Sequence, residues 1–216
     1  MTFCTRVLPA IALATTLASC AGEGELVIDQ GVGITAVLSS CPAVGIPDYT
    51  GDVTMFRAAN TPTFSNLDVS AAMTNLRATC DDSGDKVYSE ATFDVHARRS
   101  DVRGVRTVTL PYFVTVLQGG SAVVTKRIGQ VTLDFADGEE RASTSAKAGS
   151  FVDRAAASLP EDIRERITRR RRAGDPEAAL DPLAAPEVRA AIARTRFEML
   201  IGFQLTEDQL AYNATR

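Results

Sequence analysis

His96 is the only histidine of the chain, and it is the first residue that a hydrolase or an imidazole-based zinc site would need. The chain contains no G-x-S-x-G segment that would present a nucleophilic serine on a sharp turn. Asp94 lies on the same face of a predicted strand, and residues from neighbouring strands would have to complete any site. We interpret His96 as a surface residue of that strand and expect no enzymatic activity.

Asp81, Ser83 and Asp85 have the spacing that begins a calcium-binding EF-hand loop. Lys86 stands where that loop requires glycine, and Thr92 stands where it requires a bidentate glutamate, so the motif fails at both ends. Aspartate and serine are also the residues with which tight turns bond their own backbone. We predict a hairpin turn here, and a weak cation site is the alternative.

Residues 31–36 read GVGITA, which matches the G-x-G-x-x-A fingerprint of dinucleotide-binding folds by its letters. That fingerprint requires a strand before it, a helix after it and a βαβ unit around it. Cys41-Pro42 and a β-rich sequence follow instead. A glycine-rich tether or a first strand over residues 32–38 explains the segment better, and we expect no cofactor and no metal.

The most concentrated charge of the chain lies in a predicted helix that runs from Pro160 to about residue 172. Its arginines are Arg164, Arg166, Arg169, Arg170, Arg171 and Arg172. Acidic residues of the same helix, among them Glu161 and Glu165, offset part of this charge, so a solvated helix face is one interpretation. The other is a partner-binding face for an envelope protein, an anionic lipid or a glycan, and it is the strongest functional candidate in the sequence.

The first 20 residues have the pattern of an export signal. Arg6 is their only charge, and the apolar run that follows it is too short to span a membrane. The run closes in Leu17-Ala18-Ser19-Cys20, which resembles the lipobox of bacterial lipoproteins. The alternative is an ordinary secretory signal that has a cysteine near its cleavage site.

The lipoprotein resemblance implies cleavage before Cys20, transfer of a diacylglyceryl group to its thiol and acylation of its new amine. Several acyl chains are sufficient for stable membrane anchoring. Ala21 stands where an aspartate would favour the inner membrane in Gram-negative lipoproteins. The resemblance therefore implies a lipid anchor in the cell envelope, on the periplasmic face of the outer membrane.

The proposed export signal determines what we expect of each of the four cysteines. Cys4 leaves with the signal and Cys20 carries lipid, so Cys41 and Cys80 remain as an even pair in an oxidising compartment. We predict a disulfide between them. The alternative is a metal or redox site, but neither a C-x-x-C motif nor a nearby histidine supports it.

Composition bounds the size of the domain and its partners. Removing the signal leaves about 200 residues, enough for one good core or for a core with an appendage. Loss of Arg6 changes the net charge from −4 to −5, which gives no argument for nucleic acid as a partner, and the exported address argues against one. Only Lys86, Lys126 and Lys147 among the 23 basic residues are lysines. Because genome composition can produce such an arginine bias, a cluster of arginines is weaker evidence for a binding site in this chain.

From Gly51 to Val152 apolar residues recur at every second position, which is typical of antiparallel strands with one buried face. The inward sets are Val87, Ser89, Ala91, Phe93, Val95 and Ala97, then Val108, Leu110, Tyr112, Val114 and Val116, and later Val131, Leu133 and Phe135. In an earlier strand the pattern slips at Asn75, which predicts a bulge. Turn signals at 81–84, 104, 119–120 and 137–138 indicate consecutive hairpins.

Past Phe151 the pattern favours helices, which we predict over residues 153–158, 160–172 and 187–194. Five apolar residues then alternate, namely Phe197, Met199, Ile201, Phe203 and Leu205. They predict a strand that returns to the sheet. Thr206-Glu207-Asp208-Gln209 is a capping box, which predicts a terminal helix to about Tyr212.

These patterns predict a mainly β fold with a helical C-terminal excursion. The predicted segments are a signal peptide (1–19), a lipidated N-terminus with a tether or first strand (20–40), a β-sandwich (41–151), a helical excursion (152–194), and a returning strand with a short helix (195–216). We expect an antiparallel β-sandwich with an immunoglobulin-like layout, and a small up-and-down barrel is the alternative. The expected function is a non-enzymatic binding or structural role in the envelope. The alternative is a periplasmic small-ligand carrier or a hydrolase with a site that no motif reveals.

Overall fold

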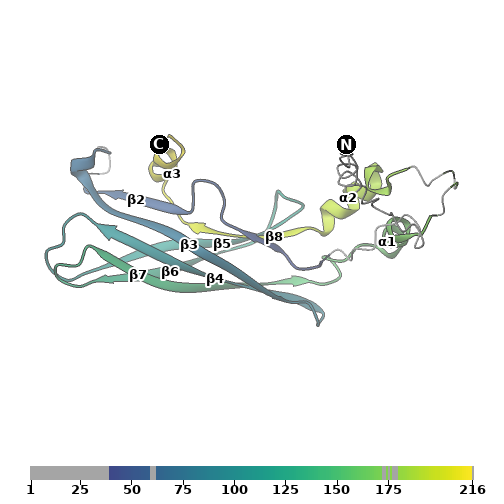
Figure 1. Cartoon of the computed structure of the whole chain (residues 1–216), viewed down its shortest axis with the longest axis horizontal. Helices are drawn as coiled ribbons and strands as arrows, with labels where there is room; N and C mark the ends of the chain where they lie inside the picture. The colour runs from purple at the N-terminus through teal and green to yellow at the C-terminus, as the bar shows by residue number, and fades with distance from the viewer. Residues whose placement is uncertain (1–38, 59–61, 172–173, 175, 177–179, 216) are drawn as a thin grey trace, which may run out of the picture.

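The computed structural model describes residues 39–58, 62–171, 174, 176 and 180–215. In these residues, eight strands form two four-stranded sheets, with the orders β1-β8-β5-β6 and β2-β3-β4-β7. Figure 1 shows the sheets as two layers that run along the long axis of the molecule. The predicted β-sandwich is confirmed, because the described strands form two separate ladders and not one closed ring.

The strands are long compared with the helices. They are β1 (Ala43–Gly45), β2 (Asp52–Phe56), β3 (Leu67–Asp81), β4 (Lys86–Arg99), β5 (Arg106–Gln118), β6 (Ala122–Phe135), β7 (Arg141–Asp153) and β8 (Phe197–Phe203). The helices are α1 (Glu161–Thr168), α2 (Pro186–Thr195) and α3 (Glu207–Thr215), with two 3-10 turns, η2 (Phe64–Asn66) and η3 (Pro182–Ala184). Within this set all neighbouring strands are antiparallel except β1 and β8.

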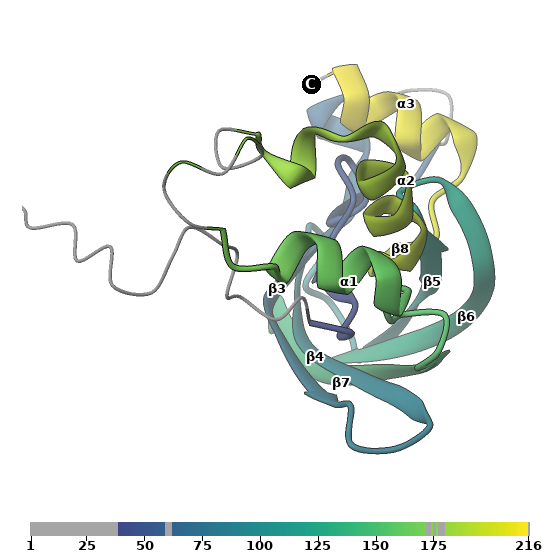
Figure 2. The same cartoon turned by 90° about the vertical axis from the view of Figure 1, so that its right-hand side faces the viewer.

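The long hairpins give the sandwich two different ends. The β3–β4 turn (82–85) and the β5–β6 turn (119–121) lie at the end that carries α1 and α2, which we call the helical end. The connections 100–105 and 136–140, which carry the chain from one sheet to the other, lie at the opposite end, which we call the loop end. Figure 2 looks onto the helical end, with α1 and α2 in front of the strands.

The core lies between the sheets and is built from the inward face of each strand. Its largest apolar side chains that are under 2 % exposed are Phe93, Phe135, Phe203, Leu133, Met199 and Ile201. Phe93 of one sheet and Tyr112 of the other meet edge to face, with ring centroids 5.3 Å apart. Burial of each large apolar side chain contributes about 1.5–3 kcal/mol, so this layer holds the two sheets together.

The slip predicted at Asn75 is a bulge in β3. The register with β4 shifts between Thr74 and Arg77, and Asn75 adopts a φ of 52°. Asparagine tolerates this left-handed conformation better than most residues, which explains its use at the bulge. Its side-chain amide donates to Asp94 Oδ2 at 2.8 Å and ties the bulge to β4.

The predicted returning strand is β8, which lies between β1 and β5. The capping box that follows it is also confirmed. The backbone N–H of Thr206 donates to Gln209 Oε1 at 2.9 Å, and the N–H of Gln209 donates to Thr206 Oγ1 at 3.3 Å. Asn213 of α3 then donates to the carbonyls of Tyr49 and Asp52, so the terminal helix is attached beside β2.

Two helix predictions are wrong in their extent. Residues 154–158 form turns, because β7 continues to Asp153 and its carboxylate accepts the N–H of Ala155 at 2.8 Å. The helix predicted to reach residue 172 ends at Thr168, where Arg169 takes a ψ of 122° that is not helical. Arg171, described below, then donates hydrogen bonds to the carbonyls of Arg166 and Leu180.

The predicted disulfide joins Cys41 to Cys80, with 6.1 Å between their Cα atoms. It links the segment before β1 to the last turn-proximal residues of β3, at the helical end. Cys20, the GVGITA segment and the strand suggested for residues 32–38 all lie outside the described residues.

Candidate functional site

The arginines predicted to bind a partner lie at the helical end, and two of them are engaged in exposed ion pairs. Arg164 pairs with Glu161 on α1, and Arg166 Nη1 lies 2.5 Å from Glu187 Oε1 on α2. The backbone N–H of Glu187 and the Arg166 guanidinium hold the pKa of the Glu187 carboxyl below its usual range. Exposed pairs of this kind contribute about 0–1 kcal/mol, and only the Arg166–Glu187 pair joins α1 to α2.

Arg171 has a structural position instead. It is 9 % exposed, and its guanidinium donates to the carbonyls of Leu180 at 3.1 Å and Arg166 at 3.4 Å. A buried guanidinium that is bonded to its own chain does not reach a partner. We therefore remove Arg171 from the candidate binding face, while Arg172 lies outside the described residues.

Arg169 and Arg170 are exposed, as Arg164 and Arg166 are, but they lie outside the ion pairs described above. They directly follow the last turn of α1, where the helix dipole favours positive charge. In the part of the chain that the structure describes, neither side chain forms an ion pair or a side-chain hydrogen bond. Both guanidiniums are therefore available to an anionic partner.

The described chain begins beside this cluster. Ser39 and Ser40 line a cavity of about 700 Å³ whose other walls include Arg164 and Ile167 of α1. The Ser40 hydroxyl donates to Asp82 in the β3–β4 turn at 3.0 Å. The residues that precede Ser39 therefore join the sandwich at the helical end.

The loop end also gathers arginines, but there the chain itself supplies their partners. Arg99, the last residue of β4, is 1 % exposed and lies over the Phe135 ring at 5.2 Å from its centroid. Its guanidinium donates at 2.7–2.8 Å to the carbonyls of Val102, Gly104, Ala136 and Glu139. One side chain thus fastens both connections between the sheets.

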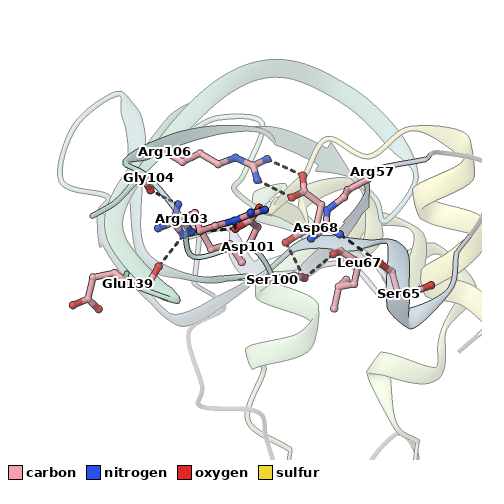
Figure 3. A network of polar contacts seen from close by, with 11 residues as sticks. Arg57, Ser65, Leu67, Asp68, Ser100, Asp101, Arg103, Gly104, Arg106 and Glu139 are labelled. Carbon is pink, nitrogen blue, oxygen red and sulfur yellow. Dashed lines mark hydrogen bonds and ion pairs between the residues drawn. The ribbon is translucent and has the colours of Figure 1, made fainter. Parts of the chain in front are cut away.

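Around Arg99 two further arginines are paired with carboxylates, as Figure 3 shows. Arg106 of β5 binds Asp68 of β3 through two bonds of 2.7 Å, so this pair joins the two sheets. The Arg106 bonds hold the pKa of Asp68 below its ordinary value, against the opposing effect of burial. Arg103 pairs with Asp101 at 2.6 Å, and its bonds hold the pKa of Asp101 well below the usual range.

His96 is exposed on the outer face of β4, as expected. Asp94 shares that face, but its two oxygens accept hydrogen bonds from the Ser145 hydroxyl at 2.7 Å and the Asn75 amide at 2.8 Å. These bonds hold the pKa of the Asp94 carboxyl below its ordinary value. The aspartate contacts the serine directly and not through the imidazole, which is not the arrangement of a catalytic triad.

The segment with EF-hand spacing forms the predicted hairpin turn. Asp81 Oδ1 accepts the backbone N–H of Ser83 at 3.0 Å and its hydroxyl at 2.7 Å, and these bonds lower the pKa of the Asp81 carboxyl. Among the described residues, no group of three or more His, Cys, Asp and Glu side chains is arranged to hold a metal ion.

No protein-family model matches the chain, and comparisons with curated proteins and with solved structures give no match. None of the helices in the described residues combines the length and the apolar character that crossing a bilayer requires.

Proposed function

We propose that this protein is a lipid-anchored envelope protein with a non-enzymatic binding or structural role, and that its helical end faces the membrane. The observation that supports this orientation is the position of Ser39. It lines the same cavity as α1, whose last turn Arg169 and Arg170 follow, so the described chain begins at the helical end and not at the loop end.

Chain length limits how far this end can lie from the anchor. Residues 21–38 provide 18 residues between Cys20 and Ser39. Even fully extended, they would span at most ~60–65 Å, and a compact path would span far less. The acyl chains proposed for Cys20 would therefore keep the helical end within this distance of the periplasmic face of the outer membrane, so that it can reach the membrane surface.

Arg169 and Arg170 suit an anionic partner at that surface. Each arginine near an anionic membrane contributes about 1 kcal/mol, and the attraction falls off within a Debye length of about 8 Å at physiological salt. Anchoring makes such a weak contact effective because it raises the local concentration of the partner. An acidic face of an envelope protein would be recognised by the same two guanidiniums.

The anchor is tested by labelling cells with radioactive palmitate. We expect a Cys20→Ser variant to lose the label and to leave the membrane fraction. Cys4→Ser is the matched control, because Cys4 lies in the proposed signal peptide, which is cleaved off. This variant should keep both the palmitate label and its place in the membrane fraction. Retention of the label in Cys20→Ser would refute the lipoprotein assignment.

The binding face is tested by cross-linking in intact envelopes, followed by mass-spectrometric mapping of the linked peptides. The proposal predicts links to peptides around α1 that disappear when Arg169 and Arg170 are both changed to glutamine. Arg127→Gln, an exposed arginine on β6, is the control and should leave the links unchanged. Links that survive the double change would remove these arginines from the binding role.

A further inference from the structure

The outer face of the β2-β3-β4-β7 sheet carries a trough of about 610 Å³ that neither the anchor nor α1 explains. Two rows of outward residues cross all four strands and line it. One row is Asp52, Ala72, His96 and Ser143, and the next is Thr54, Ser70, Arg98 and Arg141. Small side chains from β2, β3 and β7 form the hollow, while the long cationic side chains stand on β4 and β7.

The trough contains two arginines that oppose one another. Arg98 of β4 and Arg141 of β7 are direct register partners, so their Cβ atoms lie about 4.5–5.5 Å apart. Like charges placed directly opposite one another destabilise a sheet. His96 lies two residues from Arg98 on the same face and adds a third potential cation to this side of the trough.

Ion pairs within the described chain neutralise only part of the positive charge of Arg98 and Arg141. Glu140 Oε1 accepts from Nε of Arg98 at 2.7 Å and lies 2.7 Å from its Nη2, which leaves Nη1 directed elsewhere. Within the described part of the chain Arg141 forms no ion pair. This differs from Arg99 and Arg106 nearby, which are held by carbonyls and a carboxylate of the chain.

Hydroxyl groups complete the set of donors. Ser143 lies two residues from Arg141 on the same face of β7 and can donate to an oxygen that sits between the arginines, while Ser70 is the register partner of Arg98 on the β3 side of the trough. The one carboxylate in the lining, Asp52, is on β2, two strands from His96, which is ~10 Å at the usual strand spacing. The β4–β7 side is therefore the part of the trough that suits negative charge.

We propose that the trough binds an oxyanion, a phosphate or carboxylate group carried by a polar ligand of about the size of a sugar. The oxyanion sits between Arg98 and Arg141, where it relieves their repulsion and accepts charge-assisted hydrogen bonds. The open hollow over Ala72 and Ser70 takes the uncharged part of the ligand. This site is independent of the lipid anchor and of the α1 arginines.

The test is calorimetric titration of the full chain, purified from the expressing cells in an uncharged detergent, at constant ionic strength. The probes are inorganic phosphate and glucuronate, with glucose as the uncharged match for glucuronate. We expect saturable binding of at least one anion at about 1 mM or tighter, and no binding of glucose alone. Phosphate binding alone would indicate a phosphate ester, and glucuronate binding alone would indicate a sugar acid.

Two variants should change the affinity in opposite directions. Arg141→Gln removes an unpaired guanidinium and should weaken binding about tenfold. Glu140→Gln removes the carboxylate that competes for Arg98 and should tighten binding severalfold, which a merely structural role for these residues would not produce. Arg127→Gln on the other sheet is the control and should bind as the unchanged chain does.

Ser143→Leu provides a steric test that keeps every charge. It fills the hollow from an exposed strand position that tolerates an apolar side chain, so the fold should persist while binding is lost. A circular dichroism melt checks that each variant is folded. Absence of saturable anion binding by the unchanged chain, or equal affinity in Arg141→Gln and Arg127→Gln, would overturn the proposal.

Discussion

The two ends of this sandwich use the same side chain in different ways. At the loop end, Arg99 and Arg106 direct their guanidiniums into the protein, toward four carbonyls and a carboxylate. At the helical end, Arg169 and Arg170 are exposed and form no ion pair with another described residue. The arginines of this chain therefore include some with a structural role and others whose guanidiniums are free of ion pairs with described residues.

Backbone geometry explains the difference. Arginine has five N–H donors in a planar fork, and it needs several acceptors that converge on one place. The connections 100–105 and 136–140 run past the end of β4, and their carbonyls accept four hydrogen bonds from Arg99. Among the described residues no such set of carbonyls bonds Arg169 or Arg170, whereas the carbonyls of Arg166 and Leu180 accept from Arg171.

The largest expected effect on stability comes from removing the guanidinium of Arg99 at the loop end. Arg99→Met should lower the free energy of unfolding by about 4–5 kcal/mol, because four hydrogen bonds to a charged donor are lost and the carbonyls recover only part of this from water. Urea denaturation measures the loss. Arg98→Met, the outward-facing neighbour in an exposed pair, should cost less than ~1 kcal/mol, and similar losses for both variants would contradict the contrast.

The helical end depends on a covalent link where the loop end depends on hydrogen bonds. Replacing both Cys41 and Cys80 with alanine should lower the free energy of unfolding by about 2–4 kcal/mol, because the unfolded chain loses a closed loop. Thermal unfolding with and without a reductant gives the same comparison. Ser40→Ala, which removes only the bond to Asp82, should change stability by less than about 0.5 kcal/mol.

The Asp68–Arg106 pair should give the loop end a pH dependence. Asp68→Asn should cost about 1–2 kcal/mol at pH 7, because the pair is largely buried on the aspartate side, where 15 % of the side chain is exposed. Since the folded pKa of Asp68 lies below its ordinary value of 3.8, the contribution is complete above that value and is lost as the pH falls through the folded pKa.

Urea titrations at several pH values measure this difference. The stability gap between the unchanged chain and Asp68→Asn should be constant near neutral pH and should narrow only in acid below about pH 4. A gap that grew on acidification would mean that the pair does not stabilise the ionised carboxylate.

The smallest expected effects distinguish adjacent arginines at the helical end. Arg171→Met should destabilise the protein by about 1 kcal/mol, because two carbonyls lose their donor. Arg170→Met should change stability by less than about 0.5 kcal/mol, since its side chain contacts no described partner. Urea denaturation of the two variants measures both changes in the free energy of unfolding. Equal losses would show that the burial of Arg171 does not make it more important for stability than Arg170.

Much of the sandwich could be predicted from local pattern. Side-chain direction alternates in a strand, so the apolar series of β4 shows its buried face directly, and the slip at Asn75 shows the bulge. The capping box and the late strand β8 are equally local signals. The extent of α1 was missed: the chain leaves the helix at Arg169, and Arg171 bonds the carbonyls of Arg166 and Leu180, which the run of arginines does not indicate.

The structural role of Arg99 was missed, although the sequence contains a signal for it. Arg99 continues the inward series of β4 that ends, as predicted, at Ala97, so its position implies burial despite its charge. A buried arginine must find several acceptors, and this requirement alone would have marked it as structural. Its partners come from residues up to 40 positions away, which no local pattern identifies.

The sequence by itself determined the β class, the bulge, the terminal cap and the even cysteine pair, because each depends on neighbours within a few residues or on simple counting. Only the tertiary structure decided which arginines are available. A guanidinium is engaged when distant carbonyls or carboxylates converge on it, as at Arg99 and Arg106, and it remains accessible where the fold brings none, as at Arg141 and Arg170. That convergence is a property of the packed sheets and their connections, since the partners are brought together only when the chain folds.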